Sequence, residues 1–392
     1  IDGRDVAILH NGMLLDNFTL PDGYRFTPAA MNDRLGYYGD PIFDFGQHGY
    51  IPPSGYKTLC SQNLPNPLVK PGENFNTVLY TGNGGTQSIT GVGFQPDLVW
   101  IKSRSFEANN CLTDAVRGAT KTLFSDGTWE ESTLTEGVGS FDSDGFTVGN
   151  NTSMNGDLNS FVAWNFRGGD TVTNNDGSIP SEVSANRDMG FSVVKWNMGT
   201  QGLKTIGHGL GKIPDLIITK KSDGDQRWEV LAPQVLGVDD GLVLNDESVA
   251  AFQATWGSFQ PTDKLFMFTQ TPGDYIAYCF TNTEMLQVGS YLGNGVYDGT
   301  FVGLPFSPAY VMAKPIDAAY NWTIIDDARN PSNTRDFMLQ ADLYAAESVT
   351  DTFDFYSNGF KAKNNADYIN GSGKSYLYLA ISEQPFKQAR GR

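Results

Sequence analysis

The chain of 392 residues is longer than one ordinary domain, and its length predicts two to four domains. Its 27 Lys and Arg against 44 Asp and Glu give a formal net charge of −17. This charge argues against a nucleic acid or an anionic membrane as partner, because either would repel the chain. No apolar run approaches the roughly 18 residues that span a bilayer, so membrane insertion is not expected. A low charged fraction with 12% aromatic residues and 44 Gly is typical of a β-rich protein with many turns.

The termini and the cysteines add two expectations. The first residue is Ile1 rather than Met, as expected for part of a longer product or for a processed chain. Cys60, Cys111 and Cys279 are odd in number and widely spaced, so they predict neither a disulfide framework nor a zinc site. They fit a protein that is assembled in a reducing cytoplasm.

The first seventy residues differ from the rest of the chain. "VAILHNGMLL" (6–15) alternates on both sides of an Asn-Gly pair, which predicts a β-hairpin. "PIFDFGQHGYIPPSGYKTL" (41–59) predicts a short strand followed by a segment rich in Pro and Gly.

A short apolar segment then occurs three times, each time with a proline six residues before a lysine. The copies are "TGVGFQPDLVWIKSRS" (90–105), "GHGLGKIPDLIITKKSD" (207–223) and "GLPFSPAYVMAKPID" (303–317). The proline suits the entrance of a strand, where no backbone donor is required. The apolar run after it shows no alternation, which indicates a strand covered on both faces. These runs are Leu98–Ile101, Leu216–Thr219 and Tyr310–Ala313.

Three further landmarks accompany each copy in the same order. A segment that ends in small residues precedes it, at 76–84, 192–200 and 287–295. A hairpin signal with Asp-Gly or Asn-Gly follows at 140–148 and 355–363, where the second copy has a different turn at 261–268. An aromatic strand closes each unit, at 161–166, 275–280 and 376–381. The repeated unit of roughly 95 residues has the size of a small β-sandwich.

The sequence therefore predicts an all-β fold of tandem β-sandwich modules of jelly-roll or lectin-like type. The expected boundaries are 1–70 for a partial sandwich, 75–169 for repeat 1, 170–189 for a linker, 190–283 for repeat 2 and 284–386 for repeat 3. Only 281–289 separates repeats 2 and 3, so these two should pack closely. The best helical candidate is "LYAAESV" (343–349). Stacking such modules would lengthen a rod, and a symmetric oligomer would protect their edge strands.

Two resemblances follow from these segments. "DFGQ" (44–47), "PPSGYK" (52–57) and "NLP" (63–65) resemble the C-terminal end of the SPRY-like, concanavalin-type sandwich of bacteriophage tail proteins, and the hairpin at 6–15 is similar to a late strand pair of that domain. "GFQPDLVWIKSR", "DAVRGATKTLFSD", "SFDSDGFTVG" and "FVAWNFRGG" resemble a module repeated in tail and fibre proteins of bacteriophages, especially those of marine and cyanobacterial hosts. This second resemblance covers 75–169 and, with more divergence, 190–386.

The resemblances imply a virion structural protein in a tail fibre or similar host-facing appendage. They also imply a homo-oligomer, with a trimer as the expectation, and other virion tail proteins as partners. The protein would be assembled in the host cytoplasm and exposed on the extracellular particle. They supply no catalytic residue.

No catalytic, cofactor-binding or metal-binding residue is predicted. His10, His48 and His208 have no spacing that suits a metal pair. His208 lies between glycines in "GHGLG", where a turn residue is favoured over a base or ligand. "GNGVYDG" (293–299) lacks the strand and helix that a phosphate loop needs.

Repeated charged residues allow a functional and a structural interpretation. Lys102, Lys220 and Lys314 would either grip a ligand or, as favoured, place an amine in water with the stem over apolar surface. An Asp-x-x-Arg recurs as Asp114/Arg117 and Asp326/Arg329, and an ion pair that braces a turn is favoured over a site. In repeat 2, the residues two and five places after Glu229 are Leu231 and Gln234.

Two weaker candidates remain. "DSDG" (142–145), with Asn150 and Asn151, has oxygens for calcium, although a solvated turn is favoured. Trp129, Trp256 or Tyr320 would stack on sugar rings if exposed, although most aromatic residues of such a chain belong to the core.

Three functions therefore compete. They are a virion structural protein, a receptor-binding adhesin for a host surface polysaccharide, and, ranked last, a tailspike enzyme that degrades the polysaccharide. An exposed aromatic surface would favour the adhesin, and a cleft with two facing carboxylates would favour the enzyme.

Overall fold

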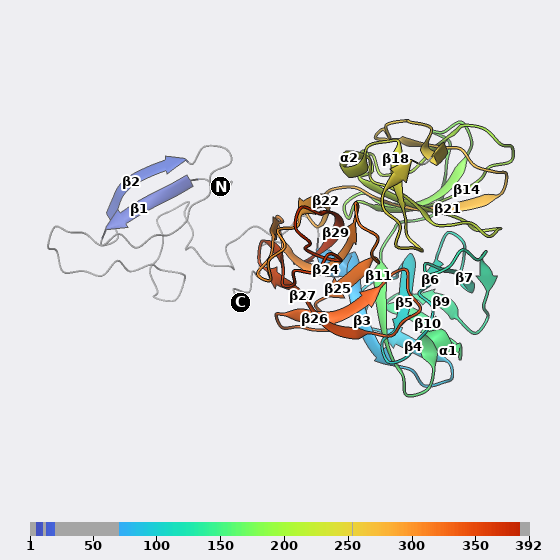
Figure 1. Cartoon of the computed structure of the whole chain (residues 1–392), viewed down its shortest axis with the longest axis horizontal. Coiled ribbons are helices and arrows are strands. Elements are labelled where there is room, and N and C mark those ends of the chain that lie inside the picture. Colours follow the sequence, from blue (N-terminus) through green and yellow to red (C-terminus); the bar gives the residue numbers. More distant parts are fainter. Residues whose placement is uncertain (1–4, 11–12, 20–69, 253, 385–392) are drawn as a thin grey trace. The chain divides into compact units, whose positions relative to one another are not determined.

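The computed structural model describes residues 5–10, 13–19 and 70–384 except 253, within a chain that divides into two compact units, 1–66 and 67–392. In the first unit β1 (Asp5–His10) pairs antiparallel with β2 (Met13–Thr19), which confirms the expected hairpin (Figure 1). The segments at 44–47, 52–57 and 63–65, which resemble the SPRY-like sandwich, lie outside the described residues, as do His48 and Cys60.

The second unit is built from antiparallel strands that form three modules with corresponding strand order (Figure 1). We define module 1 as residues 75–166, module 2 as 172–280 and module 3 as 286–384. Among the described residues the only α-helices are single turns, α1 (Thr152–Asn155) and α2 (Pro233–Leu236), and no helix is long and apolar enough to cross a membrane. The all-β fold expected from composition is confirmed.

Module 1 follows a short 3₁₀ turn, η2 (Pro71–Glu73), and packs a sheet of order β3-β11-β5-β6-β7-β8 against one of order β4-β10-β9. Its strands are β3 (Phe75–Thr81), β4 (Gln87–Thr90), β5 (Leu98–Ser103), β6 (Cys111–Asp114), β7 (Lys121–Phe124), β8 (Ser132–Thr133), β9 (Val138–Asp142), β10 (Gly145–Val148) and β11 (Ser160–Phe166).

Module 2 has a sheet of order β12-β13-β14-β21-β16-β17-β18-β19 and a second sheet of β15 and β20, with a 3₁₀ turn η3 (Ala254–Trp256). Its strands are β12 (Val172–Asn174), β13 (Ser181–Asn186), β14 (Phe191–Asn197), β15 (Lys204–Gly207), β16 (Leu216–Lys221), β17 (Glu229–Leu231), β18 (Asp240–Val243), β19 (Ala251–Phe252), β20 (Leu265–Phe268) and β21 (Asp274–Phe280).

Module 3 has strand order β22-β29-β24-β25-β26-β27-β28-β23. Its strands are β22 (Leu286–Leu292), β23 (Phe301–Gly303), β24 (Ser307–Pro315), β25 (Thr323–Asp326), β26 (Arg335–Gln340), β27 (Ser348–Tyr356), β28 (Gly359–Ala362) and β29 (Ser375–Gln384).

Two segments differ from the sequence-based expectation. Residues 170–189, expected to form a linker, contain β12 and β13, which extend the sheet of module 2 through β14 because Val183 and its neighbours join that module's core. Residues 343–349 form no helix, and β27 begins at Ser348.

The thrice-repeated apolar segment is the central strand of each module. β5, β16 and β24 each lie beside the closing aromatic strand, β11, β21 or β29, in antiparallel register. Val99, Ile217 and Val311 occupy the same position in the three strands and are all 0% exposed. The prediction of a strand covered on both faces is confirmed.

The two faces of each central strand are covered by different partners. Val99 and Ile101 face the core of module 1, where they pack with Phe146 and Phe161. The alternate side chains, Leu98 and Trp100 in module 1, join a cluster that contains residues of all three modules. This pattern explains why the strand carries apolar residues without alternation, since neither face contacts water.

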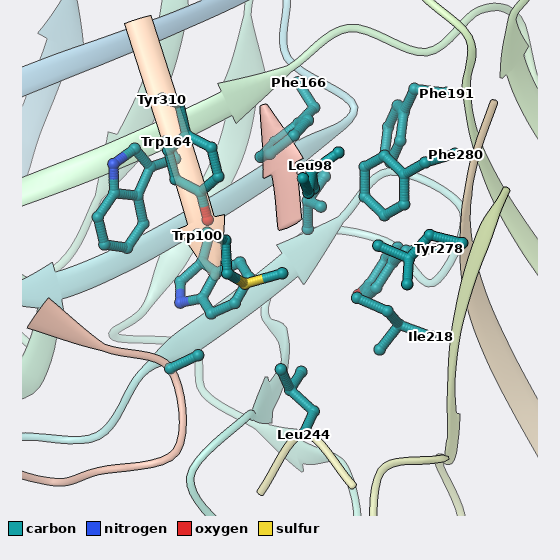
Figure 2. Close-up of a cluster of buried hydrophobic side chains, with 14 of the residues drawn as sticks. Leu98, Trp100, Trp164, Phe166, Phe191, Ile218, Leu244, Tyr278, Phe280 and Tyr310 are labelled. Atoms are coloured by element: carbon teal, nitrogen blue, oxygen red, sulfur yellow. The ribbon is translucent and has the colours of Figure 1, made fainter. Parts of the chain in front are cut away.

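The shared cluster is a single core between the modules. Figure 2 shows side chains from β5, β11, β14, β16, β21 and β24 pointing toward one another. Aromatic rings contact one another across module boundaries. Trp164 and Tyr310 meet edge-on with a centroid distance of 5.8 Å, and Phe166 and Phe191 are tilted at 5.2 Å. The sequence led us to expect modules stacked end to end. The structure shows instead that the three modules surround one shared hydrophobic core.

Glycine is required at the hairpins for a reason that the turn alone does not supply. In module 1 the central turn residues are Ser143 and Asp144, and Gly145 begins β10 with φ 146°. A Cβ there would lie 2.0 Å from the carbonyl oxygen of Ile89 on β4. Gly359 of module 3 has φ 147° and meets a backbone oxygen at the same 2.0 Å. The close approach of a third strand therefore excludes any side chain.

Candidate functional site

The contacts between modules repeat in a cycle. We call the contacts interface 1–2, interface 2–3 and interface 3–1, after the modules that they join. At each interface the backbone amide of the residue directly before β8, β19 or β27 donates to a carbonyl just beyond the central strand of the next module. The bonds are Glu131 to Ser222 (2.8 Å), Ala250 to Ile316 (2.8 Å) and Glu347 to Arg104 (3.1 Å). The modules are thus related by a pseudo-threefold arrangement.

A side-chain bond follows the same cycle. At interface 1–2 the indole nitrogen of Trp228 donates to the carbonyl of Phe124 at 2.8 Å, and at interface 2–3 Trp322 donates to Val243 at 2.8 Å. At interface 3–1 the equivalent position is Asn110, whose amide donates to the carbonyl of Gln340 at 3.1 Å. The three acceptors occupy the same register position opposite β6, β17 and β25.

The three repeated lysines lie at these boundaries and do not reach water. All three side chains are at most 1% exposed, and each ammonium donates to backbone carbonyls. Lys102 bonds Ala108 and, at 3.0 Å, Leu343 of module 3, whereas Lys314 bonds Glu247 of module 2 at 3.2 Å. Lys220 bonds the carbonyls of Lys221 and Gly224 in its own module. Burial lowers the pKa of each lysine to about 8.

The expectation of an amine in solvent is therefore wrong, because the carbonyls at the ends of these strands need donors that water does not supply. The lysines stabilise the fold by donating to backbone carbonyls, and none of them points into an open ligand site.

The first Asp–Arg pair is part of interface 1–2. The guanidinium of Arg117 contacts Asp114 at 2.6 Å and Glu131 at 3.1 Å, and the hydroxyl of Tyr278, from module 2, donates to Asp114 at 2.9 Å. Burial opposes the charge of Arg117, but Asp114, Tyr278 and Glu131 outweigh it and raise the pKa of Arg117. Burial, followed by the charge of Asp114, raises the pKa of Tyr278.

The second pair repeats this geometry at interface 3–1. Arg329 contacts Asp326 at 2.6 Å and Glu347 at 3.1 Å, and the indole of Trp164, from module 1, donates to Asp326 at 2.9 Å. Trp164 and Tyr278 occupy the same position in the closing strands β11 and β21. The ion pairs brace turns as favoured from the sequence, and they also join modules.

Interface 2–3 replaces the whole polar set with apolar residues. Since Ile217 pairs with Leu231, the counterpart of Asp114 is Ala232 rather than Leu231. The same one-residue correction makes Val235 the counterpart of Arg117 in place of Gln234. Leu379 of module 3 stands where modules 1 and 2 have Trp164 and Tyr278. Ala232 and Leu379 are buried, and Val235 packs against the shared core.

The remaining sequence candidates also have structural roles. His208 is 0% exposed; its Nδ1 accepts from the Leu210 amide, and its Nε2 lies 3.1 Å from the Thr262 carbonyl. Burial lowers the pKa of His208 to about 4. Cys111 and Cys279 are buried free thiols with raised pKa values, caused by burial.

The proposed calcium segment is a hairpin turn. Asp144 accepts hydrogen bonds from the amides of Gly91 and Gly93, which lowers its pKa, and Asn151 caps α1 through the Ser153 amide. Within the described part of the chain, no group of three or more His, Cys, Asp or Glu side chains is placed to hold a metal ion.

The aromatic candidates divide between core and surface. Trp256 is buried, whereas Trp129 is 49% and Tyr320 38% exposed. The ring of Trp129 packs edge-on against Phe124 and covers Gly127.

A surface that sequence reasoning missed lies on β23, β27 and β28 of module 3 and on the loop before β23. We call it the module 3 outer face and define it by Tyr297, Asp298, Phe301, Asp351, Asp354, Tyr356, Lys361 and Lys363. Phe301 and Tyr297 are 45% and 55% exposed, and Phe301 contacts Tyr356 edge-on at 5.9 Å. Two residues of this face, Tyr297 and Asp298, lie in "GNGVYDG" (293–299), a segment that the sequence presented only as a candidate phosphate loop.

The polar groups of this face are joined in one network. Asp298 bridges Lys361 at 2.6 Å and Lys363 at 2.9 Å, and Lys363 also contacts Asp354 at 3.6 Å. The hydroxyl of Tyr297 donates to Asp351, and that of Tyr356 donates to Asp354 at 3.2 Å. The two lysines lower the pKa of Asp298. The face therefore combines exposed rings with hydrogen-bonding groups whose charges are paired.

The apolar centre between the modules is not a ligand site. An apolar cavity of about 10 Å³ lies there, lined by side chains such as Leu98, Ile218 and Tyr310. A space of this size is at the lower limit for one water molecule. Its lining belongs to the shared core of Figure 2.

Comparison with known proteins identifies the family of the chain. None of the curated proteins matches the chain. The model of the family described as "Domain of unknown function (DUF7483)" matches residues 70–385. This range begins at the 3₁₀ turn before module 1 and ends at the close of module 3, so the match contains the whole three-module ring. The chain belongs to the DUF7483 family.

Proposed function

We propose that the chain is a structural component of a phage tail fibre or a similar host-facing virion appendage. The resemblance of its strand segments to repeated fibre modules is the source of this proposal. The observation that carries it furthest is the use of the repeated charged residues. Lys102, Lys220, Lys314 and both Asp–Arg pairs are buried contacts within and between modules.

This use of charge suits a rigid scaffold. A fibre component must keep its form outside the cell without a cofactor, and the shared core ties three sandwiches into one folded unit. Burial of apolar surface from three modules supplies stability that a single small sandwich would lack.

A receptor-binding adhesin is the second candidate, favoured by the module 3 outer face. Exposed rings beside paired charges are the feature that distinguishes an adhesive surface from an inert one. Both roles are compatible in one appendage, since a fibre that carries a binding face serves as structure and adhesin together.

Imaging of virus particles tests the structural role. An antibody against residues 190–386, applied to particles whose genome encodes the chain, is expected to label the tail or its fibres in electron micrographs. Labelling of the capsid shell, or a complete absence of the chain from purified particles by mass spectrometry, would contradict the proposal. Particles that lack the gene give the control for antibody specificity.

A further inference from the structure

The repeated modules allow a comparison within one chain. The outer face of module 3 carries exposed aromatic residues, and the corresponding face of module 1 carries polar residues. In module 1, Ile89 pairs with Phe146 through β4 and β10, and in module 3, Val302 pairs with Phe360 through β23 and β28. The outward neighbours then correspond: Phe301 stands where module 1 has Ser88. By the same registers Tyr356 corresponds to Asp142, and Lys361 to Thr147.

The fold does not require the aromatic residues. In the fold Phe301 contacts Tyr356 of the same face, and its ring covers Gly359, where a Cβ would lie 3.0 Å from the ring. Module 1 has the same glycine conformation at Gly145 and leaves it beside Ser88, whose hydroxyl bonds Thr147 at 3.1 Å. The corresponding surface of module 1 therefore forms without such rings.

The loop that carries Tyr297 is held in place before any ligand arrives. Asn370 is 0% exposed; its side chain accepts from the Asn294 amide at 3.1 Å and donates to the Val296 carbonyl at 2.8 Å. The Gly299 amide donates to Ala362 at 2.9 Å. Asn155 holds the corresponding loop of module 1 in the same way. A surface fixed in advance binds with a smaller loss of entropy.

The module 3 loop is also longer. From Gly293 to Val302 it takes nine steps along the chain, whereas module 1 takes seven from Gly82 to Ile89. The loop, two residues longer, contains "VYD" (296–298), which places an exposed ring and a carboxylate beside β23.

The chemistry of the face selects the kind of ligand. Its charges are the three carboxylates of Asp298, Asp351 and Asp354 against the two ammonium groups of Lys361 and Lys363, and four of these five groups are paired with one another. On a chain of net charge −17, a polyanion would be repelled. A saccharide offers a C–H face for aromatic rings and hydroxyls for carboxylate and ammonium groups.

We propose that the module 3 outer face binds a neutral saccharide, with Phe301 and Tyr297 contacting its C–H faces and Asp298 and Lys361 its hydroxyl groups. This inference rests on the adhesin role proposed above and names its ligand class and its residues.

Ligand-detected NMR on the full chain tests the inference. The probes are cellotetraose, maltotetraose, chitotetraose and mannotetraose, with tetragalacturonate as the acidic comparison. At least one neutral probe is expected to show saturation transfer, and tetragalacturonate none. Phe301→Ser, which installs the residue of module 1, is expected to weaken the affinity about tenfold, as is Tyr297→Ala. Tyr344→Ala is the matched control, since Tyr344 is 52% exposed but lies outside the face, and it should bind as the parent does.

The outcomes separate this inference from the structural role. Absence of binding to every neutral probe, preference for tetragalacturonate, or equal loss in the Tyr344→Ala control would overturn the saccharide site. None of these results would alter labelling of the tail by the antibody. Conversely, capsid labelling would remove the appendage role and leave a measured saccharide affinity intact.

Discussion

Interfaces 1–2 and 2–3 join equivalent surfaces with opposite chemistry. At interface 1–2, Asp114, Arg117 and Tyr278 form a buried polar set. At interface 2–3, Ala232, Val235 and Leu379 take the same places, and the backbone bonds on either side are retained. The module boundary therefore tolerates either set, provided that all its members change together.

The physical reason is the asymmetry of buried polar groups. Removing one partner leaves a desolvated charge or donor without compensation, whereas replacing the whole set with apolar groups is often neutral or stabilising. We therefore expect the polar interfaces to contribute specificity of pairing more than stability, and a mixed interface to be the least stable arrangement.

The largest expected effect comes from breaking the polar set. Asp114→Ala leaves the guanidinium of Arg117 buried beside the hydroxyl of Tyr278 without its main counter-charge. We expect a loss of about 3–5 kcal/mol in the free energy of unfolding. Urea denaturation followed by tryptophan fluorescence measures it, with Asp326→Ala as the matched variant at interface 3–1. A loss below about 1 kcal/mol in both variants would contradict the importance of these sets.

Introducing a charge into the apolar interface should lower the free energy of unfolding by nearly as much. Ala232→Asp introduces a carboxylate at interface 2–3, where Val235 and Leu379 offer no donor. We expect destabilisation of about 2–4 kcal/mol, with part of the burden relieved by protonation at acid pH. Denaturation at pH 7 and pH 4 checks both statements. Equal stability of variant and parent at pH 7 would show that the apolar chemistry of this interface is unimportant.

Substituting the repeated lysines shows whether all three module boundaries depend on a buried ammonium donor. Lys102→Met and Lys314→Met each leave two backbone carbonyls short of a bond, one of them in a neighbouring module. We expect a loss of about 1–3 kcal/mol for each. Lys220→Met is the comparison, since the carbonyls that Lys220 bonds, those of Lys221 and Gly224, lie within module 2. Only the first two should also accelerate proteolysis between modules, as followed by mass spectrometry.

A smaller effect should follow removal of one indole bond. Trp322→Phe deletes the donor to the Val243 carbonyl at interface 2–3, and Trp228→Phe deletes the equivalent donor at interface 1–2. Each should reduce the unfolding free energy by about 1–2 kcal/mol. Differential scanning calorimetry of the two variants gives the comparison. A large difference between them would show that the two bonds are not equivalent.

The smallest effect is expected from the most extensive change. The fourfold variant Asp114→Ala, Arg117→Val, Glu131→Ala and Tyr278→Leu converts interface 1–2 into a copy of interface 2–3. We expect stability within about 1.5 kcal/mol of the parent, far above that of Asp114→Ala alone. The measurement is the same urea titration. Additive losses from the four substitutions would refute the view that each set acts as a unit.

Several features could be predicted from the sequence alone because they depend on local chemistry. The apolar runs after Pro96, Pro214 and Pro308 identified the central strands, and the closing aromatic strands followed from composition. The ion pairs were found because Asp and Arg stand three residues apart. The linker expected at 170–189 contains two strands in the structure. The sequence did not indicate them, since a polar edge strand such as β12 lacks a strong hydrophobic pattern.

The outer face of module 3 was hidden for a related reason. Its members come from β23 and the loop before it, from β27, and from β28 and the residue after it. These segments are separated in sequence and are brought together by the register of the sheet. Phe301 and Tyr297 look like core residues until their exposure is known.

By itself the sequence determined that each module has a strand buried on both faces. Hydrophobic burial has no direction, so the apolar pattern required a cover for the second face without identifying it. Only the tertiary structure decided that the cover is the other two modules. The same holds for Asp114 and Tyr278, which lie 164 residues apart and find each other across a module boundary.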